Sequence, residues 1–199
     1  MEIDATRTAV LGLHWQVNVI KPEGFFGAWF AEPVARSGVI ERAGRVLEAA
    51  REAGVPVAYT RFVVPPDGGT LVRNTPVMEQ VAESELFRPE APTVAVIEEL
   101  APRDGDLVVD NQKLSGLAGS ELPELLTDRG VDTLVLTGVA TNMTVESTAR
   151  HGIDLGFRVY VLRDCVAAAT EEAHQGSLAT LGMLTTGLAD ADEFIAALR

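Results

Sequence analysis

Short apolar runs separated by longer amphipathic stretches make up most of the chain. Each run is too short for a helix and does not alternate with polar residues, which is typical of parallel strands buried on both faces. The predicted strands are residues 8–13, 55–64, 107–109, 134–136 and 157–162. Elsewhere apolar residues recur every three or four positions, the spacing of a helix with one buried face. The predicted helices are residues 40–54, 93–100, 117–128, 171–181 and 190–198.

The alternation of strands with helices predicts a single α/β domain over residues 1–199. Such alternation indicates βαβ units with right-handed crossovers, and therefore a mainly parallel sheet. Two segments lack a regular pattern: residues 24–30 form a glycine- and aromatic-rich loop, and residues 65–92 are irregular and interrupted by proline. The second segment is interpreted as a lid or as an oligomer contact.

Residues 131–156 are the stretch around which we expect the chain to be organised. Its strand ends at Gly138, and Thr141 or Asn142 is expected to cap a helix immediately afterwards. The face of this helix expected to be buried carries Val145, Ala149 and Gly152. A strand that turns directly into a helix presents backbone N–H groups to the crevice where α/β sheets bind ligands. We therefore expect residues 138–144 to belong to the functional site.

Polar side chains also follow two other predicted strands at the point where each strand ends. His14 closes the first strand, with Gln16 and Asn18 just beyond it, and Asn111 and Lys113 follow the third strand. A polar cluster at the end of a buried strand is a signal of a site, because α/β sheets bind ligands outside the carboxyl ends of their strands.

Composition and charge narrow the classes of partner. The net charge of −13 argues against nucleic acid or an anionic membrane, since phosphate binding requires clustered Lys and Arg. No apolar run approaches the ~20 residues that span a bilayer, and the N-terminus lacks a signal-peptide pattern, so we expect a cytoplasmic protein. One cysteine and three histidines without ligand spacing predict no disulfide, no metal site and no cofactor.

Several motifs resemble those of one known family. The segment TGVATNMTVESTAR at residues 137–150, preceded by ELAPRDGDLVV and SGLAGSEL and followed by DLGFRVYVLRD, resembles the isochorismatase-like (cysteine hydrolase) family. That family includes nicotinamidases and N-carbamoyl amidohydrolases, and the resemblance covers residues 8–181. It implies a three-layer Rossmann-like fold with a six-stranded, mainly parallel sheet flanked by helices. It also implies a homodimer or homotetramer.

The resemblance implies an Asp, Lys and Cys catalytic triad, but this chain carries other residues at all three positions. His14 stands where the Asp is expected, Asn111 where the Lys is expected, and Thr144 where the nucleophilic Cys is expected. Lys113 lies two residues beyond the lysine position. The family's oxyanion hole implies backbone N–H groups of Ala140 and Thr144, which no side-chain change removes.

The altered triad suggests a rewired nucleophilic site. A threonine hydroxyl needs a base, and a histidine with an unperturbed pKa of ~6.5 suits proton transfer near neutrality. In this hypothesis His14 activates Thr144, while Asn111 and Gln16 orient groups or substrate. The opposing interpretation is that Thr144 caps or packs its helix and that His14 is simply hydrogen-bonded. Cys165 is assigned a packing role.

Other side chains are candidates for binding the substrate. Lys113 and Arg61 either hold an anionic group or belong to the solvated surface. Asn18, like Gln16, is expected to supply hydrogen bonds beside His14. Four aromatic residues either wall an apolar pocket or pack in the core or an oligomer interface: Trp15, Phe25, Phe26 and Trp29.

Three functions are compatible with these residues. The first is a hydrolase acting on a small molecule through His14, Asn111 and Thr144. The second is a catalytically silent relative that binds a small ligand or a partner through the same crevice, and the third is an isomerase or lyase using His14 as acid and base. An open pocket with His14 in hydrogen-bond reach of Thr144 favours chemistry. A cavity filled by bulky residues favours the silent protein; the candidates for this filling are Trp15, Phe26 and Met143.

Overall fold

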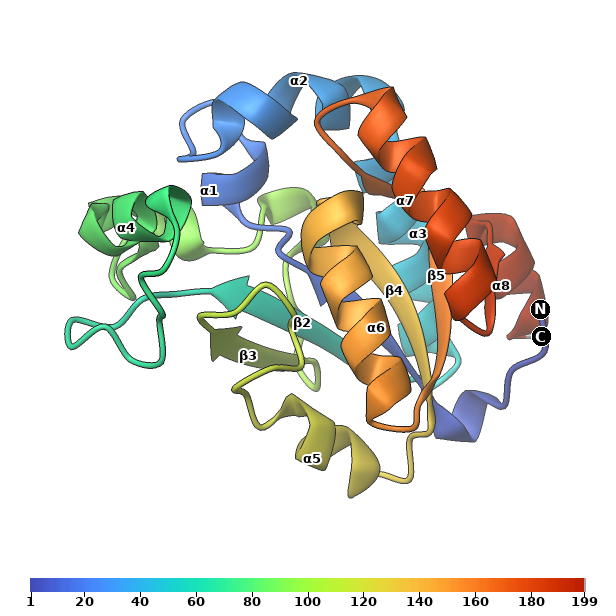
Figure 1. Ribbon diagram of the computed structural model, residues 1–199. Coiled ribbons are helices and arrows are strands. Elements are labelled where there is room, and N and C mark those ends of the chain that lie inside the picture. The colour runs from blue at the N-terminus through green and yellow to red at the C-terminus, as the bar shows by residue number, and fades with distance from the viewer. Residues whose placement is uncertain (199) are drawn as a thin grey trace.

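A computed structural model describes residues 1–198 and contains one sheet of six parallel strands. Figure 1 shows this sheet with its flanking helices. The order across the sheet is β3-β2-β1-β4-β5-β6, and every neighbouring pair is parallel. The predicted α/β fold is thus confirmed. The strands are β1 Thr8–Leu13, β2 Val57–Phe62, β3 Leu107–Asn111, β4 Thr133–Val139, β5 Arg158–Ala167 and β6 Gly187–Ala189.

Helices cover both faces of the sheet, with α3 behind it and α6 in front in Figure 1. Successive strand residues point to opposite faces, so Val10 joins the core beneath α2, α3 and α8, and Leu11 joins the core beneath α5, α6 and α7. None of the helices within residues 1–198 is long and apolar enough to cross a membrane. The helices are α1 Val17–Ile20, α2 Gly27–Ser37, α3 Val39–Glu52, α4 Pro76–Glu83, α5 Leu122–Thr127, α6 Glu146–Asp154, α7 Glu171–Leu184 and α8 Ala191–Ala197.

Two sheet elements differ from the strands expected from the sequence. The fifth strand does not end near residue 162, because β5 continues to Ala167 after a register shift opposite β4. Cys165 therefore lies within a strand, not after one. The sixth strand, β6, was not located from the residues, since three residues between two helices give no readable pattern.

The connecting segments are more regular than their composition suggested. Residues 24–30 are not all loop, because α2 begins at Gly27, and residues 65–92 contain α4, which Thr75 caps by accepting from the Met78 N–H. Residues 93–100 do not form one helix, because only the short 3-10 turns Pro92–Val94 and Glu98–Leu100 are helical. The residues between these turns pair instead with the segment after β1, since the Ile97 N–H bonds to the Trp15 carbonyl at 2.9 Å. The helix expected over residues 117–128 is confined to α5.

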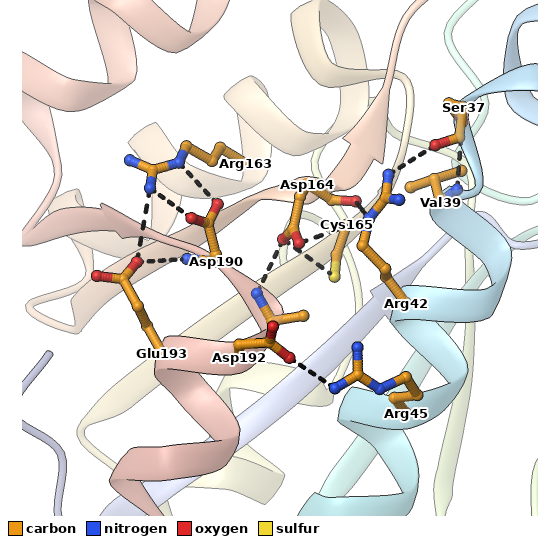
Figure 2. Close-up of polar contacts among 11 residues, drawn as sticks. Ser37, Val39, Arg42, Arg45, Arg163, Asp164, Cys165, Asp190, Asp192 and Glu193 are labelled. Atoms are coloured by element: carbon orange, nitrogen blue, oxygen red, sulfur yellow. Dashed lines mark hydrogen bonds and ion pairs between the residues drawn. The ribbon is translucent and has the colours of Figure 1, made fainter.

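Charged side chains attach α8 to β5 and α3, as Figure 2 shows. Asp190 caps α8 and also pairs with Arg163, while the Asp164 carboxylate accepts from the Ala191 N–H at 2.9 Å. From α3, Arg42 donates to the Asp164 carbonyl at 2.7 Å. These contacts surround Cys165, whose thiol is buried and whose pKa is raised by that burial. The thiol stays protonated, in agreement with a packing role.

β1 and β4 pair up to the end of β1, where Gly138 lies against Leu13. Gly138 pairs with Leu13 and has a φ of 139°, a conformation that favours glycine. A Cβ at Gly138 would lie 2.3 Å from the Leu13 carbonyl oxygen. The close contact at the strand termini therefore requires that position 138 carry no side chain.

We predict that Gly138→Ala lowers the free energy of unfolding by about 2 kcal/mol or more, since backbone strain and overpacking each cost in the range of about 1–3 kcal/mol. Urea denaturation measures the change. Gly176→Ala in α7 is the matched control: an added Cβ there meets nothing within 4 Å, and alanine favours the helix, so stability should hold or rise. Equal losses in the two variants would contradict the argument.

Candidate active site

The carboxyl edge of the sheet brings together His14, Asn111 and Thr144, the three residues expected to form the site. His14 directly follows β1, Asn111 is the last residue of β3, and Thr144 lies in η5, a π-helical turn over Thr141–Val145 that connects β4 to α6. All three side chains are buried. The site is thus formed by segments that are far apart in the sequence, joined through the strand order of the sheet.

The central contact is a hydrogen bond between Thr144 Oγ1 and His14 Nδ1 at 3.0 Å. The two residues are only 4% and 5% exposed, so water does not compete for this bond. His14 has a φ of 53°, in the left-handed region, and its N–H is held by the Thr60 carbonyl at 3.1 Å. A left-handed histidine is strained and is maintained by its surroundings.

Asn111 is oriented so that its amide oxygen is left for another donor. Its Nδ2 donates to the carbonyls of Ser115 at 2.7 Å and Ala118 at 3.3 Å. Asn111 Oδ1 and His14 Nε2 are both buried, and neither forms a hydrogen bond of good geometry within the described residues. If the Thr144 hydroxyl donates to Nδ1, the imidazole proton resides on Nε2, for which Asn111 Oδ1 is a suitable acceptor.

Burial controls the protonation of His14. Removal from water lowers the pKa of the imidazole from 6.5 to about 4, and an interaction with the Asn111 side chain opposes this shift only partly. The ring is therefore neutral at pH 7. A neutral imidazole has a free nitrogen lone pair, which the Thr144 hydroxyl can approach as a donor.

The turn after β4 is widened around Thr144. The Ala140 carbonyl accepts from the N–H groups of Met143 and Val145, both at 3.1 Å, and passes over that of Thr144 between them. The expected side-chain cap is wrong: η5 begins after Ala140 without one, and the Thr141 hydroxyl instead bonds to His174 Nδ1 at 2.9 Å. The π-helical turn is therefore closed by backbone hydrogen bonds to the Ala140 carbonyl, and the Thr141 hydroxyl bonds to α7 in place of capping a helix.

A cavity of about 60 Å³ adjoins the His14–Thr144 pair. Among its lining residues these two supply the only polar side chains, and the segments 24–30 and 65–92 contribute much of the apolar wall. Phe26 and Ala140, both expected at the site, line it. The full lining is His14, Val19, Phe26, Phe30, Phe62, Met78, Val81, Phe87, Leu114, Val139, Ala140, Met143 and Thr144.

Two polar residues expected to bind substrate instead fasten the loops of the site. The Gln16 amide donates to the Phe62 carbonyl at 3.2 Å and accepts from the Phe62 N–H at 2.6 Å. Asn18 donates to the Leu86 carbonyl at 3.2 Å. Both side chains are fully buried and neither lines the cavity, so their role is corrected from substrate contact to loop attachment.

The cationic and outer aromatic candidates also lie away from the cavity lining. Lys113 donates to the Thr70 carbonyl, and Arg61 forms an ion pair with Asp110 at 2.7 Å. Trp29 is 52% exposed, outside the lining. Trp15 neither lines nor fills the cavity, because its indole N–H donates to Thr137 Oγ1 at 3.2 Å within the core.

Sequence reasoning missed most of the apolar wall. Val81 on α4, Phe87 after it and Leu114 after β3 had no polar signal to single them out. The Thr75-Pro76 start of α4 was the available clue, because a threonine cap followed by proline is a helix-start pattern. Within residues 1–198 no group of three or more His, Cys, Asp and Glu side chains is arranged to hold a metal ion.

Comparison with known proteins agrees with this architecture. Residues 8–193 match the Isochorismatase domain family, and the chain belongs to that family. Maleamate amidohydrolase from Pseudomonas putida is 33% identical over 153 residues, which cover 73% of this chain and 69% of that protein. Ureidoacrylate amidohydrolase RutB from Methylobacterium radiotolerans is 30% identical over 98% of this chain and 81% of that protein.

Solved structures give the same result for the fold. A cysteine hydrolase from Pseudomonas syringae superposes with a TM-score of 0.91 at 28% identity, covering 100% of this chain and 95% of that one. N-carbamoylsarcosine amidase from Thermoplasma acidophilum shares the fold with a TM-score of 0.74 at 22% identity, covering 94% and 97%. This chain therefore belongs to the class of isochorismatase-like hydrolases.

We predict that burial of neutral His14 makes folding stability sensitive to pH below neutrality. The unfolded chain takes up a proton at His14 near pH 6.5, but the folded chain does so only near pH 4, so stability falls as the pH falls through this window. Between pH 7 and 5 the loss from this residue is about 2 kcal/mol.

Urea denaturation at both pH values measures this loss, and His14→Asn serves as the comparison because asparagine tolerates a left-handed backbone. The variant should lose less stability over the same interval. The contribution of His174, whose pKa is also lowered by burial, remains in both proteins. An unchanged difference between pH 7 and 5 in the variant would contradict a buried, neutral His14.

Proposed function

We propose that this protein hydrolyses a small acyl compound, with Thr144 as nucleophile, His14 as general base and Asn111 orienting the imidazole. The observation that carries this proposal is the 3.0 Å hydrogen bond between Thr144 and His14 at the wall of a cavity. Relatives named as amidohydrolases support acyl transfer as the type of reaction. The order of threonine, histidine and asparagine follows the logic of a nucleophile, a base and a group that orients the base.

The reaction proceeds in two steps. Thr144 Oγ1 attacks the acyl carbon while its proton passes to His14 Nδ1, and the bond to the leaving group then breaks as His14 returns the proton to the departing nitrogen or oxygen. This leaves an ester on Thr144. Water then attacks the ester, His14 accepts a proton from that water and gives it back to Thr144 Oγ1, and a carboxylic acid is released.

Backbone groups near Thr144 support the charge that develops on the acyl oxygen. The Thr144 N–H does not bond to the Ala140 carbonyl, and η5 leads directly into α6, whose N-terminus carries a partial positive charge. The same burial that keeps His14 neutral also disfavours the imidazolium formed during attack. Turnover should therefore be modest, because an ideal catalytic base has a pKa near the working pH.

A second candidate function is ligand binding without chemistry. It is favoured by the small size of the cavity, whereas the filling by bulky residues expected of a silent relative is not seen, because Phe26 and Met143 line the cavity. An isomerase or lyase built on His14 as general acid is less well supported, since a pKa of about 4 leaves little protonated imidazole at pH 7.

We predict that Thr144→Val and His14→Asn each lower kcat/KM by on the order of a hundredfold or more, because each removes a partner of the proton transfer. Thr144→Ser keeps a hydroxyl and should retain measurable activity. A panel of p-nitrophenyl esters and primary amides, neutral and acidic, provides the assay. Mass spectrometry of rapidly quenched reactions should find the acyl group on Thr144. Full activity in Thr144→Val would eliminate the nucleophile and leave the binding function.

We predict that alkylation with iodoacetamide leaves activity intact. Cys165 is buried, burial raises the pKa of its thiol, and it lies apart from the cavity lining. Cys165→Ser should likewise retain the wild-type rate. Inactivation of the wild type by iodoacetamide, with Cys165→Ser protected, would mean that the nucleophile has been placed wrongly.

A further inference from the structure

The cavity beside Thr144 is apolar on nearly every side. Four phenylalanines belong to its lining, with ring centroids of Phe62 and Phe87 5.8 Å apart and those of Phe26 and Phe87 5.9 Å apart. Edge-to-face aromatic packing of this kind forms a rigid wall without hydrogen-bond donors. The polar side chains among the lining residues are those of His14 and Thr144.

The cationic side chains nearest in sequence to the lining residues are committed elsewhere. Lys113, next to Leu114, is held by the Thr70 carbonyl, and Arg61, next to Phe62, is paired with Asp110. Arg88, next to Phe87, donates to the Ala82 carbonyl at 3.0 Å. None of the three lines the cavity.

An anionic group would therefore enter this cavity without a counter-charge. Taking a carboxylate out of water without a partner is strongly unfavourable, whereas the burial of a methyl or methylene group is favourable. His14 does not compensate, because its imidazole is neutral at pH 7. The carboxylate product of hydrolysis is subject to the same cost, which favours its release.

The size of the cavity limits the chain length. A volume of about 60 Å³ accommodates a short aliphatic group, and larger parts of a ligand would extend past the rim. Leu114 and Met143 form this rim and are 49% and 41% exposed. A substituent at Leu114 is thus placed to contact the part of a ligand that emerges from the cavity.

We propose that the cavity selects short, uncharged aliphatic acyl compounds, such as amides or esters of small fatty acids, and rejects acyl compounds that carry a carboxylate in addition to the amide or ester group. The apolar wall, the absence of a cation from the lining and the small volume together carry this selection. That the bound acyl group is also cleaved rests on the proposed function; the selection itself is a property of binding.

A matched pair of ligands tests the selection: propionamide, and malonamate, in which a carboxylate replaces the terminal methyl group. Titration calorimetry and ligand-observed NMR measure binding, and ammonia release measures turnover. We expect propionamide to bind at least about a hundredfold more tightly, in line with the cost of an unpaired buried charge. Binding of malonamate as tight as that of propionamide, or tighter, would overturn the proposal, as would failure of both to bind.

Leu114→Lys supplies a cation at the rim, with Leu114→Gln as the uncharged control. The lysine variant should gain affinity for malonamate by about tenfold or more, and the glutamine variant should not. Equal gains in the two variants would contradict the electrostatic argument.

Binding of propionamide without ammonia release would refute the proposed hydrolysis of this amide while supporting the selection. Thr144-dependent hydrolysis that favours malonamate would support the proposed hydrolysis and refute the selection.

Discussion

The close pairing of β1 with β4 is the constraint on which the site depends. These two strands occupy the centre of the sheet, and Gly138 lets the Leu13 main chain approach where both strands end. His14 and the η5 turn start directly beyond that contact. The 3.0 Å bond between His14 and Thr144 is therefore a consequence of sheet packing, so the chemistry of the site and the stability of the fold depend on the same few residues.

Burial connects the properties of the site to one another. The apolar wall that limits the cavity also lowers the pKa of His14, and it makes both an imidazolium and a carboxylate unfavourable in the same space. A base that stays neutral is available to accept a proton, but it stabilises the protonated state poorly. The site is thus suited to uncharged reactants and modest rates.

The sequence was sufficient for the fold and for the placement of His14, Asn111 and Thr144 at one edge of the sheet, because buried parallel strands give continuous apolar runs and strand ends expose polar clusters. It was insufficient for Gln16 and Lys113, whose partners, Phe62 and Thr70, lie far away in the chain. Whether a polar side chain faces a cavity or a loop is decided by such non-local contacts. The short strand β6 and the helix α4 were not predicted, because their local sequence patterns are weak.

His14, Asn111 and Thr144 form a coherent set. The resemblance implies a triad containing charged aspartate and lysine, whereas His14, Asn111 and Thr144 are all uncharged at neutral pH. A buried carboxylate at position 14 without a lysine at position 111 would be an unpaired charge, which is strongly unfavourable. A lysine at position 111 alone would suffer the same penalty. With neutral residues at both positions the folded site contains no unpaired charge there, and its low polarity is compatible with an apolar cavity beside the Thr144 hydroxyl group.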